Sequence, residues 1–184
     1  MLIIFGGSFN PPTLAHKELV NKIKETYKEA KIIIVPVSKH NYTWKHNLID
    51  DENRYNMLKL MFPDIYISRY EFEIKKYEGT YQLLTDFKKI DPDIYFLIGS
   101  DNLNQMPLWL NFSNLIKDFK FIVVKRPTDV IDFTKFKGYE KNFTIIEMNS
   151  EISSTKVRED VKKHKDFLDE KVYQYIIKHK LYEV

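Results

Sequence analysis

Residues 2–16 read LIIFGGSFNPPTLAH, and the order of residue types in this stretch decides the fold class. Leu2–Phe5 is a short apolar run with β-branched residues, which is typical of a buried strand. Gly6 and Gly7 follow at once, and a helical pattern begins at about Thr13. A strand that passes through a glycine turn into a helix opens a βα unit, so the stretch predicts a parallel sheet.

The same alternation of short apolar runs and longer amphipathic segments continues along the chain. The predicted strands are 2–5, 32–37, 65–70, 94–98 and 121–124, with 143–148 as an edge strand. The predicted helices are 13–29, 50–61, 153–163 and 169–179, and loops are expected at 38–48 and 128–141. We therefore predict an α/β fold with a single doubly wound, Rossmann-like parallel sheet of about five or six strands, flanking helices and a C-terminal helical segment.

The composition limits the kinds of fold and of site that the chain can form. With 184 residues, 43% hydrophobic and 30% charged, the chain is predicted to form a single domain over residues 1–184, whose helical C-terminal part is about 152–184. The absence of cysteine excludes disulfides, thiolate zinc sites and a cysteine nucleophile. The five histidines lack zinc-like spacing, so no metal site made by protein ligands is predicted.

Charge and hydropathy argue against two classes of partner. The net charge of +3 is dispersed along the chain, without the dense basic block of a nucleic-acid-binding protein. No stretch approaches the ~20 apolar residues of a membrane span, and the N-terminal residues lack the pattern of a signal peptide. A cytoplasmic protein with neither nucleic acid nor membrane as its partner is expected.

The glycine turn is a candidate phosphate site. Glycines let backbone amides approach an anion, and a helix N-terminus adds unpaired N–H groups and partial positive charge. The turn matches neither the P-loop nor the dinucleotide-binding pattern, so a different phosphate site is needed. His16 shares a helical face with Val20, Ile23 and Tyr27, which also fits a core histidine. Its place in the first turn beyond a strand end favours a role in the site.

The segment GGSFNPPTLAH at 6–16 resembles the signature G-[ST]-F-D-P-x-[HT]-x-G-H of the nucleotidyltransferase superfamily. Asn10 stands for the usual Asp, and Ala15 for the usual Gly. The resemblance implies that His16 and Thr13 contact the triphosphate as catalytic residues. The glycine turn before them makes Gly6, Gly7, Ser8 and Phe9 candidates for ATP binding.

A second segment, ISSTKVR at 152–158, resembles the I-S-S-T-x-[IV]-R motif of the same superfamily. Its hydroxyl residues suit a helix cap, and Arg158 one turn later suits a phosphate. An ordinary capped surface helix would have the same pattern. With the resemblance, Arg158 is assigned to catalysis, and ATP binding is assigned to Ser153, Ser154 and Thr155.

Between these signatures, residues 95–103 (YFLIGSDNL) look like the G-[AS]-D-x-L step of nicotinate mononucleotide adenylyltransferases. The resemblance makes Gly99 and Asp101 candidates for ATP contacts, although Asp101 could equally cap a helix. It also places Trp109 beside the pyridine ring and Arg126 near the substrate, although a lone tryptophan is more often core. It assigns Lys45 to the phosphates, with Lys39 as its competitor, and Tyr81 to the nicotinate.

The resemblance implies an enzyme that transfers the adenylyl group of ATP to nicotinate mononucleotide, releasing pyrophosphate, in NAD biosynthesis. Mg²⁺ would be bound mainly through the ATP phosphates. Two alternatives stay open: another nucleotidyltransferase, such as a phosphopantetheine adenylyltransferase or a cytidylyltransferase, and a non-catalytic nucleotide-binding regulatory module. The choice between nicotinate and nicotinamide mononucleotide and the oligomeric state are left open by the sequence.

Overall fold

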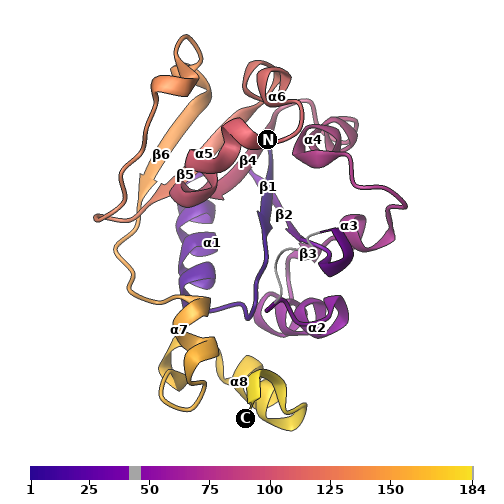
Figure 1. Cartoon of the computed structure of the whole chain (residues 1–184), viewed down its shortest axis with the longest axis vertical. Coiled ribbons are helices and arrows are strands. Elements are labelled where there is room, and N and C mark those ends of the chain that lie inside the picture. Colours follow the sequence, from indigo (N-terminus) through magenta and orange to yellow (C-terminus); the bar gives the residue numbers. More distant parts are fainter. Residues whose placement is uncertain (42–46, 184) are drawn as a thin grey trace. The chain divides into compact units, whose positions relative to one another are not determined.

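Within residues 1–41 and 47–183, which the computed structural model describes, six strands form one sheet in the order β3-β2-β1-β4-β5-β6 (Figure 1). The strands are β1 (Leu2–Gly7), β2 (Lys31–Pro36), β3 (Tyr66–Ile67), β4 (Ile94–Gly99), β5 (Lys120–Lys125) and β6 (Phe143–Glu147). β1 runs parallel to β4, β4 to β5 and β5 to β6. The order reverses between β1 and β4, as in a doubly wound fold, so the predicted fold class is confirmed.

The apolar runs become strands because the sheet is buried on both faces. Ile3 and Ile4 are consecutive, so their side chains point to opposite faces, and neither has any exposed surface. Leu97 of β4 lies opposite Phe5 of β1 and is equally buried. β6 differs, because Ile145 is exposed on a strand with one neighbour, and the predicted edge strand is confirmed.

The third strand is shorter than predicted. The sequence predicted a strand over 65–70, but β3 spans only Tyr66–Ile67. Ser68 Oγ accepts a hydrogen bond from the Tyr70 amide at 3.1 Å, and the chain turns at once into the helix α3 (Tyr70–Glu73). A side chain that bonds the backbone two residues on competes with the strand ladder, which explains the early end.

The longer helices follow the predicted amphipathic segments. The helices are α1 (Leu14–Thr26), α2 (Asp51–Met61), α3, α4 (Gly79–Lys88), α5 (Ser100–Gln105), α6 (Phe112–Asp118), α7 (Ser154–Glu159) and α8 (Glu170–Lys178). The prediction of a helix over 153–163 was wrong at its end, because Asp160 leaves helical geometry with φ −160° and ψ 100°. No helix had been predicted at α4, α5 or α6.

One predicted loop contributes to the core. The segment 128–141 contains two 3-10 turns, Thr134–Phe136 and Glu140–Asn142, and no longer helix. Phe136 is nevertheless buried, with its ring 4.9 Å from that of Phe143 and 5.8 Å from that of Phe112. The description of this segment as a loop at the rim was therefore incomplete, because its aromatic side chain packs inward.

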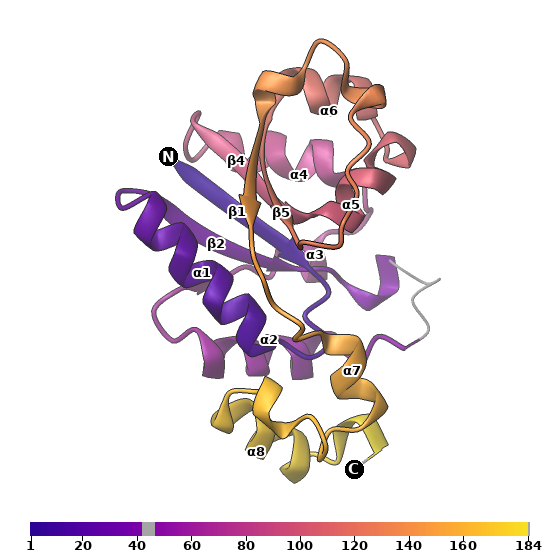
Figure 2. The same ribbon diagram turned by 90° about the vertical axis from the view of Figure 1, so that its left-hand side faces the viewer.

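The chain divides into two compact units. The first unit comprises residues 1–6, 29–34 and 74–149, and the second comprises 7–28, 35–73 and 150–184. In the second unit α8 lies against α2 (Figure 1, Figure 2). The Tyr175 hydroxyl donates to Asn53 Oδ1 there at 2.8 Å. In the part of the chain that is described, no helix is long and apolar enough to cross a membrane.

Candidate active site

The turn between β1 and α1 belongs to the second unit from Gly7 onward. Phe9 has a positive φ of 47°, which is uncommon for a residue other than glycine. Its buried ring lies 5.2 Å from the His16 ring, measured between centroids. A Cβ on Gly7 would come within 3.0 Å of the Phe9 ring, so glycine leaves the space that this ring needs. The turn therefore packs Phe9 against the first turn of α1.

The hydrogen bonds of His16 fix its tautomer. The backbone nitrogen of Thr13, which precedes α1, lies 2.9 Å from His16 Nδ1. A backbone N–H can only donate, so Nδ1 is the acceptor and the proton of the neutral ring lies on Nε2. Thr13 Oγ1 is also 2.9 Å from Nδ1, and Thr13 is fully buried. Thr13 thus holds the half-buried His16 ring, which has a donor at Nε2 that suits a phosphate oxygen.

A buried arginine supports this turn. Arg54 of α2 has no exposed surface. Its guanidinium donates to the carbonyls of Ser8 at 2.9 Å, Val37 at 2.6 Å and Ile49 at 3.2 Å. It also pairs with Asp51. Burial lowers the pKa of Arg54 and the Asp51 carboxylate raises it. The cation joins the turn after β1 to the end of β2 and the start of α2.

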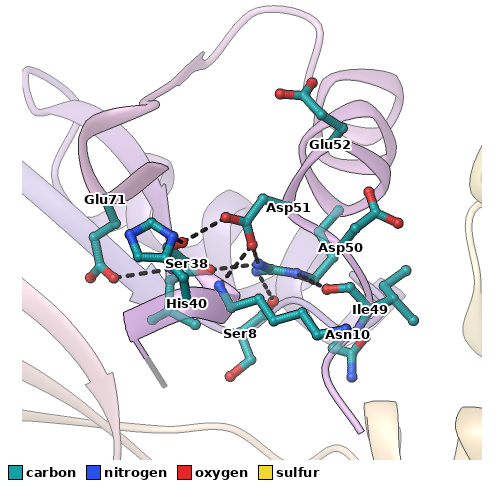
Figure 3. Close-up of polar contacts among 12 residues, drawn as sticks. Ser8, Asn10, Ser38, His40, Ile49, Asp50, Asp51, Glu52 and Glu71 are labelled. Atoms are coloured by element: carbon teal, nitrogen blue, oxygen red, sulfur yellow. Dashed lines mark hydrogen bonds and ion pairs between the residues drawn. The ribbon is translucent and has the colours of Figure 1, made fainter. Parts of the chain in front are cut away.

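The carboxylate partner of Arg54 is itself fully bonded. Asp51 Oδ2 accepts from Ser38 Oγ at 2.6 Å, and Asp51 Oδ1 accepts from the Lys39 amide at 2.7 Å (Figure 3). Ser38 Oγ is also 2.5 Å from His40 Nδ1. These bonds fix the segment after β2, where Lys39 begins a 3-10 turn. Lys45, the other predicted phosphate lysine, lies outside the described residues.

Arg54 was not predicted to be a site residue. A signal was present, because Arg54 precedes Leu58 and Met61 by four and seven residues and so lies on the apolar stripe of α2. A charge on such a stripe must find buried partners. An arginine with an acidic residue three positions earlier is equally typical of a surface helix, and the pattern alone favours that interpretation.

The second signature contacts the same turn. Ser154 Oγ donates to the carbonyl of Pro11 at 2.7 Å, although 143 residues separate the two in the chain. Arg158 Nη1 donates to the carbonyl of Asn10 at 2.7 Å, and its Nη2 donates to Thr155 Oγ1 at 3.2 Å. The turn before α1 and the helix α7 are therefore joined within one unit.

The cap of α7 follows the predicted chemistry. Ser153 Oγ accepts from the Lys156 amide at 3.3 Å, as the hydroxyl of a helix N-cap does. A guanidinium has more N–H donors than the two that Arg158 uses for Asn10 and Thr155. Arg158 can therefore bind an anion without leaving the turn.

In the first unit, the carboxyl ends of β1 and β4 lie at one edge of the sheet, since the two strands are parallel. A Cβ on Gly6 would come within 2.8 Å of the Phe96 ring, so glycine is required there. The Trp109 ring packs edge-on against the same Phe96 ring, with centroids 6.4 Å apart. Gly6 and Trp109 therefore both lie against one aromatic ring of β4.

The turn after β4 places a carboxylate at this edge. Gly99 is the N-cap of α5, and Asp101 lies exposed in the first helical turn. A Cβ on Gly99 would come within 2.5 Å of Asp101 Oδ1, because the carboxylate folds back over the glycine. The position suits a ligand contact and helix-terminus stabilisation equally well.

The turn after β5 is held to the same edge. The Asp129 carboxylate accepts from Ser100 Oγ at the start of α5 and from the Arg126 amide at 2.9 Å. Both bonds lower the pKa of Asp129, and the bond from Ser100 has the larger effect. The exposed Arg126 is thereby fixed near the Gly99 turn, and the first unit gathers Gly6, Gly99, Asp101, Trp109 and Arg126.

Tyr81 is not brought to this group. Its hydroxyl donates to Asp118 at 3.0 Å, which raises the pKa of Tyr81, and its ring packs against Phe119. Asp118 and Phe119 directly precede β5, so they lie at the amino end of the strand whose carboxyl end leads to Arg126. The structure thus places Tyr81 at the opposite edge of the sheet from Arg126.

Comparison with known proteins identifies the family. Residues 4–160 match the cytidylyltransferase-like family. A probable nicotinate-nucleotide adenylyltransferase of Acholeplasma laidlawii (strain PG-8A) is 35% identical over 186 residues, which cover 100% of this chain and 98% of that protein. The chain belongs to the cytidylyltransferase-like family, among its nicotinate-nucleotide adenylyltransferases. The predicted superfamily is therefore confirmed.

Solved structures of this family show the same fold. A Plasmodium falciparum nicotinic acid mononucleotide adenylyltransferase complexed with APC is 25% identical, with a TM-score of 0.78 and coverage of 99% of this chain and 96% of that chain. The same enzyme complexed with NaAD is 24% identical, with a TM-score of 0.78 and coverage of 99% and 97%. The likeness extends over both compact units of this adenylyltransferase.

Replacing Arg54 tests how strongly it holds the turn. Arg54→Met leaves Asp51 without its cation and three backbone carbonyls without their donor, so we expect a loss of about 3–5 kcal/mol in the free energy of unfolding. Urea unfolding measures this loss of stability. The control is Arg69→Met, which removes the exposed pair with Glu52 and should cost below about 1 kcal/mol. Equal losses in the two variants would contradict the role of Arg54.

Proposed function

We propose that the chain transfers the adenylyl group of ATP to nicotinate mononucleotide, forming nicotinate adenine dinucleotide and pyrophosphate, as a step of NAD biosynthesis. One observation carries the proposal: the turn that leads into α1 and the His16 Nε2 donor is bonded to Ser154 and Arg158 of α7, inside a single unit. The Acholeplasma laidlawii relative and the Plasmodium enzyme complexed with NaAD support the choice of substrates.

In the proposed reaction, an oxygen of the mononucleotide 5′-phosphate attacks the α-phosphorus of ATP in line. The bond from that phosphorus to the bridging oxygen breaks, and pyrophosphate leaves with the bonding electron pair. No protein nucleophile is needed, so catalysis consists of positioning and of stabilising the charge that moves to the leaving group. His16 would donate Nε2–H to a phosphate oxygen, and Arg158 would add a cationic donor.

Mg²⁺ is proposed to enter with ATP. In the part of the chain that the structure describes, no group of three His, Asp or Glu side chains is placed to hold a metal ion. The side chains of the turn offer hydroxyl, imidazole and guanidinium groups, which suit phosphate oxygens better than Mg²⁺. ATP would therefore supply most of the metal's ligands.

Three wider proposals follow. The family match over residues 4–160 and the Acholeplasma relative, which is aligned over 100% of this chain, support residues 1–184 acting as one catalytic domain. Both substrates carry phosphate charges that make them costly to move into a bilayer, which supports a cytoplasmic enzyme.

In the first unit, we propose that Trp109 and Arg126 bind the mononucleotide, while Gly99 and Asp101 contact ATP.

A pyrophosphate-release assay tests the proposed function. With ATP and nicotinate mononucleotide, the enzyme should release one pyrophosphate per dinucleotide formed, and nicotinamide mononucleotide in a parallel reaction measures the preference. CTP with phosphocholine and ATP with phosphopantetheine test the other nucleotidyltransferase activities. ATP binding without pyrophosphate release from any pair would instead support a regulatory module.

Replacing His16 separates catalysis from helix capping. We expect His16→Ala to lower kcat by about 10²–10³, the scale of losing one preorganised transition-state donor. In His16→Asn, the side-chain oxygen can still accept from the Thr13 amide, but the donor at Nε2 is lost, so the same fall is expected. The exposed His179→Ala is the control. Near-normal kcat in His16→Asn would leave His16 with a capping role alone.

Arg158 is expected to act on ATP binding. Arg158→Ala should raise the KM for ATP by about ten- to a hundred-fold, the scale of losing charge-assisted hydrogen bonds. Lys156→Ala, an exposed cation in the same helix, is the matched control and should leave this KM unchanged. An ATP dependence that is equal in the two variants would contradict the assignment.

A further inference from the structure

Asn10 joins four parts of the second unit. Its side chain is 5% exposed, and its Nδ2 donates to the carbonyl of Asn47 at 2.8 Å. Its Oδ1 accepts from the Ile49 amide at 3.4 Å and from the Tyr182 hydroxyl at 2.9 Å. Its backbone carbonyl accepts from Arg158 at 2.7 Å. A movement of Asn10 therefore moves the partner that orients the Arg158 guanidinium.

The amide of Asn10 is required by these partners. Asn47 offers a carbonyl, which only accepts, so the group facing it must be a donor. An aspartate at position 10, as in the superfamily signature, would turn a carboxylate oxygen toward that carbonyl in a buried place. The amide also leaves Oδ1 as the acceptor for Tyr182.

The backbone around Tyr182 is strained where its side chain reaches Asn10. Its backbone has φ 59° and ψ 39°, and Lys180 and Glu183 also have positive φ values. None of the three is glycine, so each left-handed residue is strained. Burial raises the pKa of Tyr182, against the opposing effect of Arg54 and Arg158, so its hydroxyl stays protonated as a donor.

Other contacts dock the C-terminal segment. Lys17 of α1 pairs with Asp169, the N-cap of α8, at 2.7 Å. Val172 and Ile176 of α8 are fully buried. Tyr175 bonds Asn53 on α2. The contacts that hold α8 therefore do not involve Tyr182, whose hydroxyl bonds Asn10.

We propose that Tyr182 is a positioning residue for ATP, which acts through Asn10 on the turn after β1 and on Arg158. The proposal rests on the proposed function, because it assigns ATP to that turn. The Tyr182 hydroxyl holds Asn10 Oδ1, the Asn10 carbonyl holds the guanidinium, and the guanidinium meets the triphosphate. Loss of the hydroxyl leaves the ring in place and loosens the first of these bonds.

The test compares two tyrosines that each bond an asparagine. Tyr182→Phe should raise the KM for ATP by about three- to ten-fold, as expected for one hydrogen bond, with the KM for nicotinate mononucleotide unchanged. Tyr175→Phe removes the hydroxyl that joins α8 to α2, and should leave both KM values unchanged while lowering Tm at least as much. Equal effects of the two variants on the KM for ATP would overturn the proposal.

A double-mutant cycle with Asn10→Ala tests the route. If Tyr182 acts through Asn10, Tyr182→Phe should cause no further rise in the KM for ATP in the Asn10→Ala background. An undiminished rise there would overturn the proposal. Calorimetric titration of each variant with ATP gives the same comparison without turnover. Absence of pyrophosphate release from the unmodified enzyme would refute the proposed function, whereas equal ATP affinity of Tyr182→Phe and the unmodified enzyme would refute the inference.

Discussion

The second unit depends on one buried positive charge. The guanidinium of Arg54 binds carbonyls from the turn after β1, from Val37 directly after β2 and from Ile49 in the segment before α2. Removing a partner from a buried charge is costly, so these three segments are held as one piece. Asp51 compensates the charge and also bonds Ser38 and the Lys39 amide. The rigid turn that this creates is the support on which His16 is oriented.

The same turn has its carbonyl groups directed to donors of the protein. The carbonyls of Ser8, Asn10 and Pro11 accept from Arg54, Arg158 and Ser154, respectively. Carbonyl oxygens carry partial negative charge and would repel a triphosphate that approached them. With each of them bonded to a side chain, the turn can present donors to an anion. The donors come from α2 and α7, far from the turn in sequence, which explains why both segments are needed to form it.

The sequence predicted the elements that depend on a local pattern of residues. β1, β2, β4 and β5 were predicted because each is an apolar run, and β3 was overestimated because Ser68 bonds the backbone beyond it. The two signatures were found by resemblance, but their contact at Asn10 and Pro11 spans more than 140 residues and has no local signal. Arg54 and Phe136 were missed for a related reason, since both look like surface residues until their partners elsewhere in the chain are known.

Arg54 and Arg158, the two arginines near the turn, have different electrostatic surroundings. Those of Arg54 suit a structural role, and those of Arg158 suit ligand binding. Arg54 is paired with Asp51 and bonded to carbonyls, so its positive charge is largely compensated within the protein. Among the ion pairs of residues 1–41 and 47–183, Arg158 has no carboxylate partner, and its bonds go to a carbonyl and a hydroxyl. Neutral acceptors fix the direction of a guanidinium without cancelling its charge. Arg158 thus keeps its positive charge for an anionic ligand, while its direction is set by the Asn10 carbonyl and the Thr155 hydroxyl.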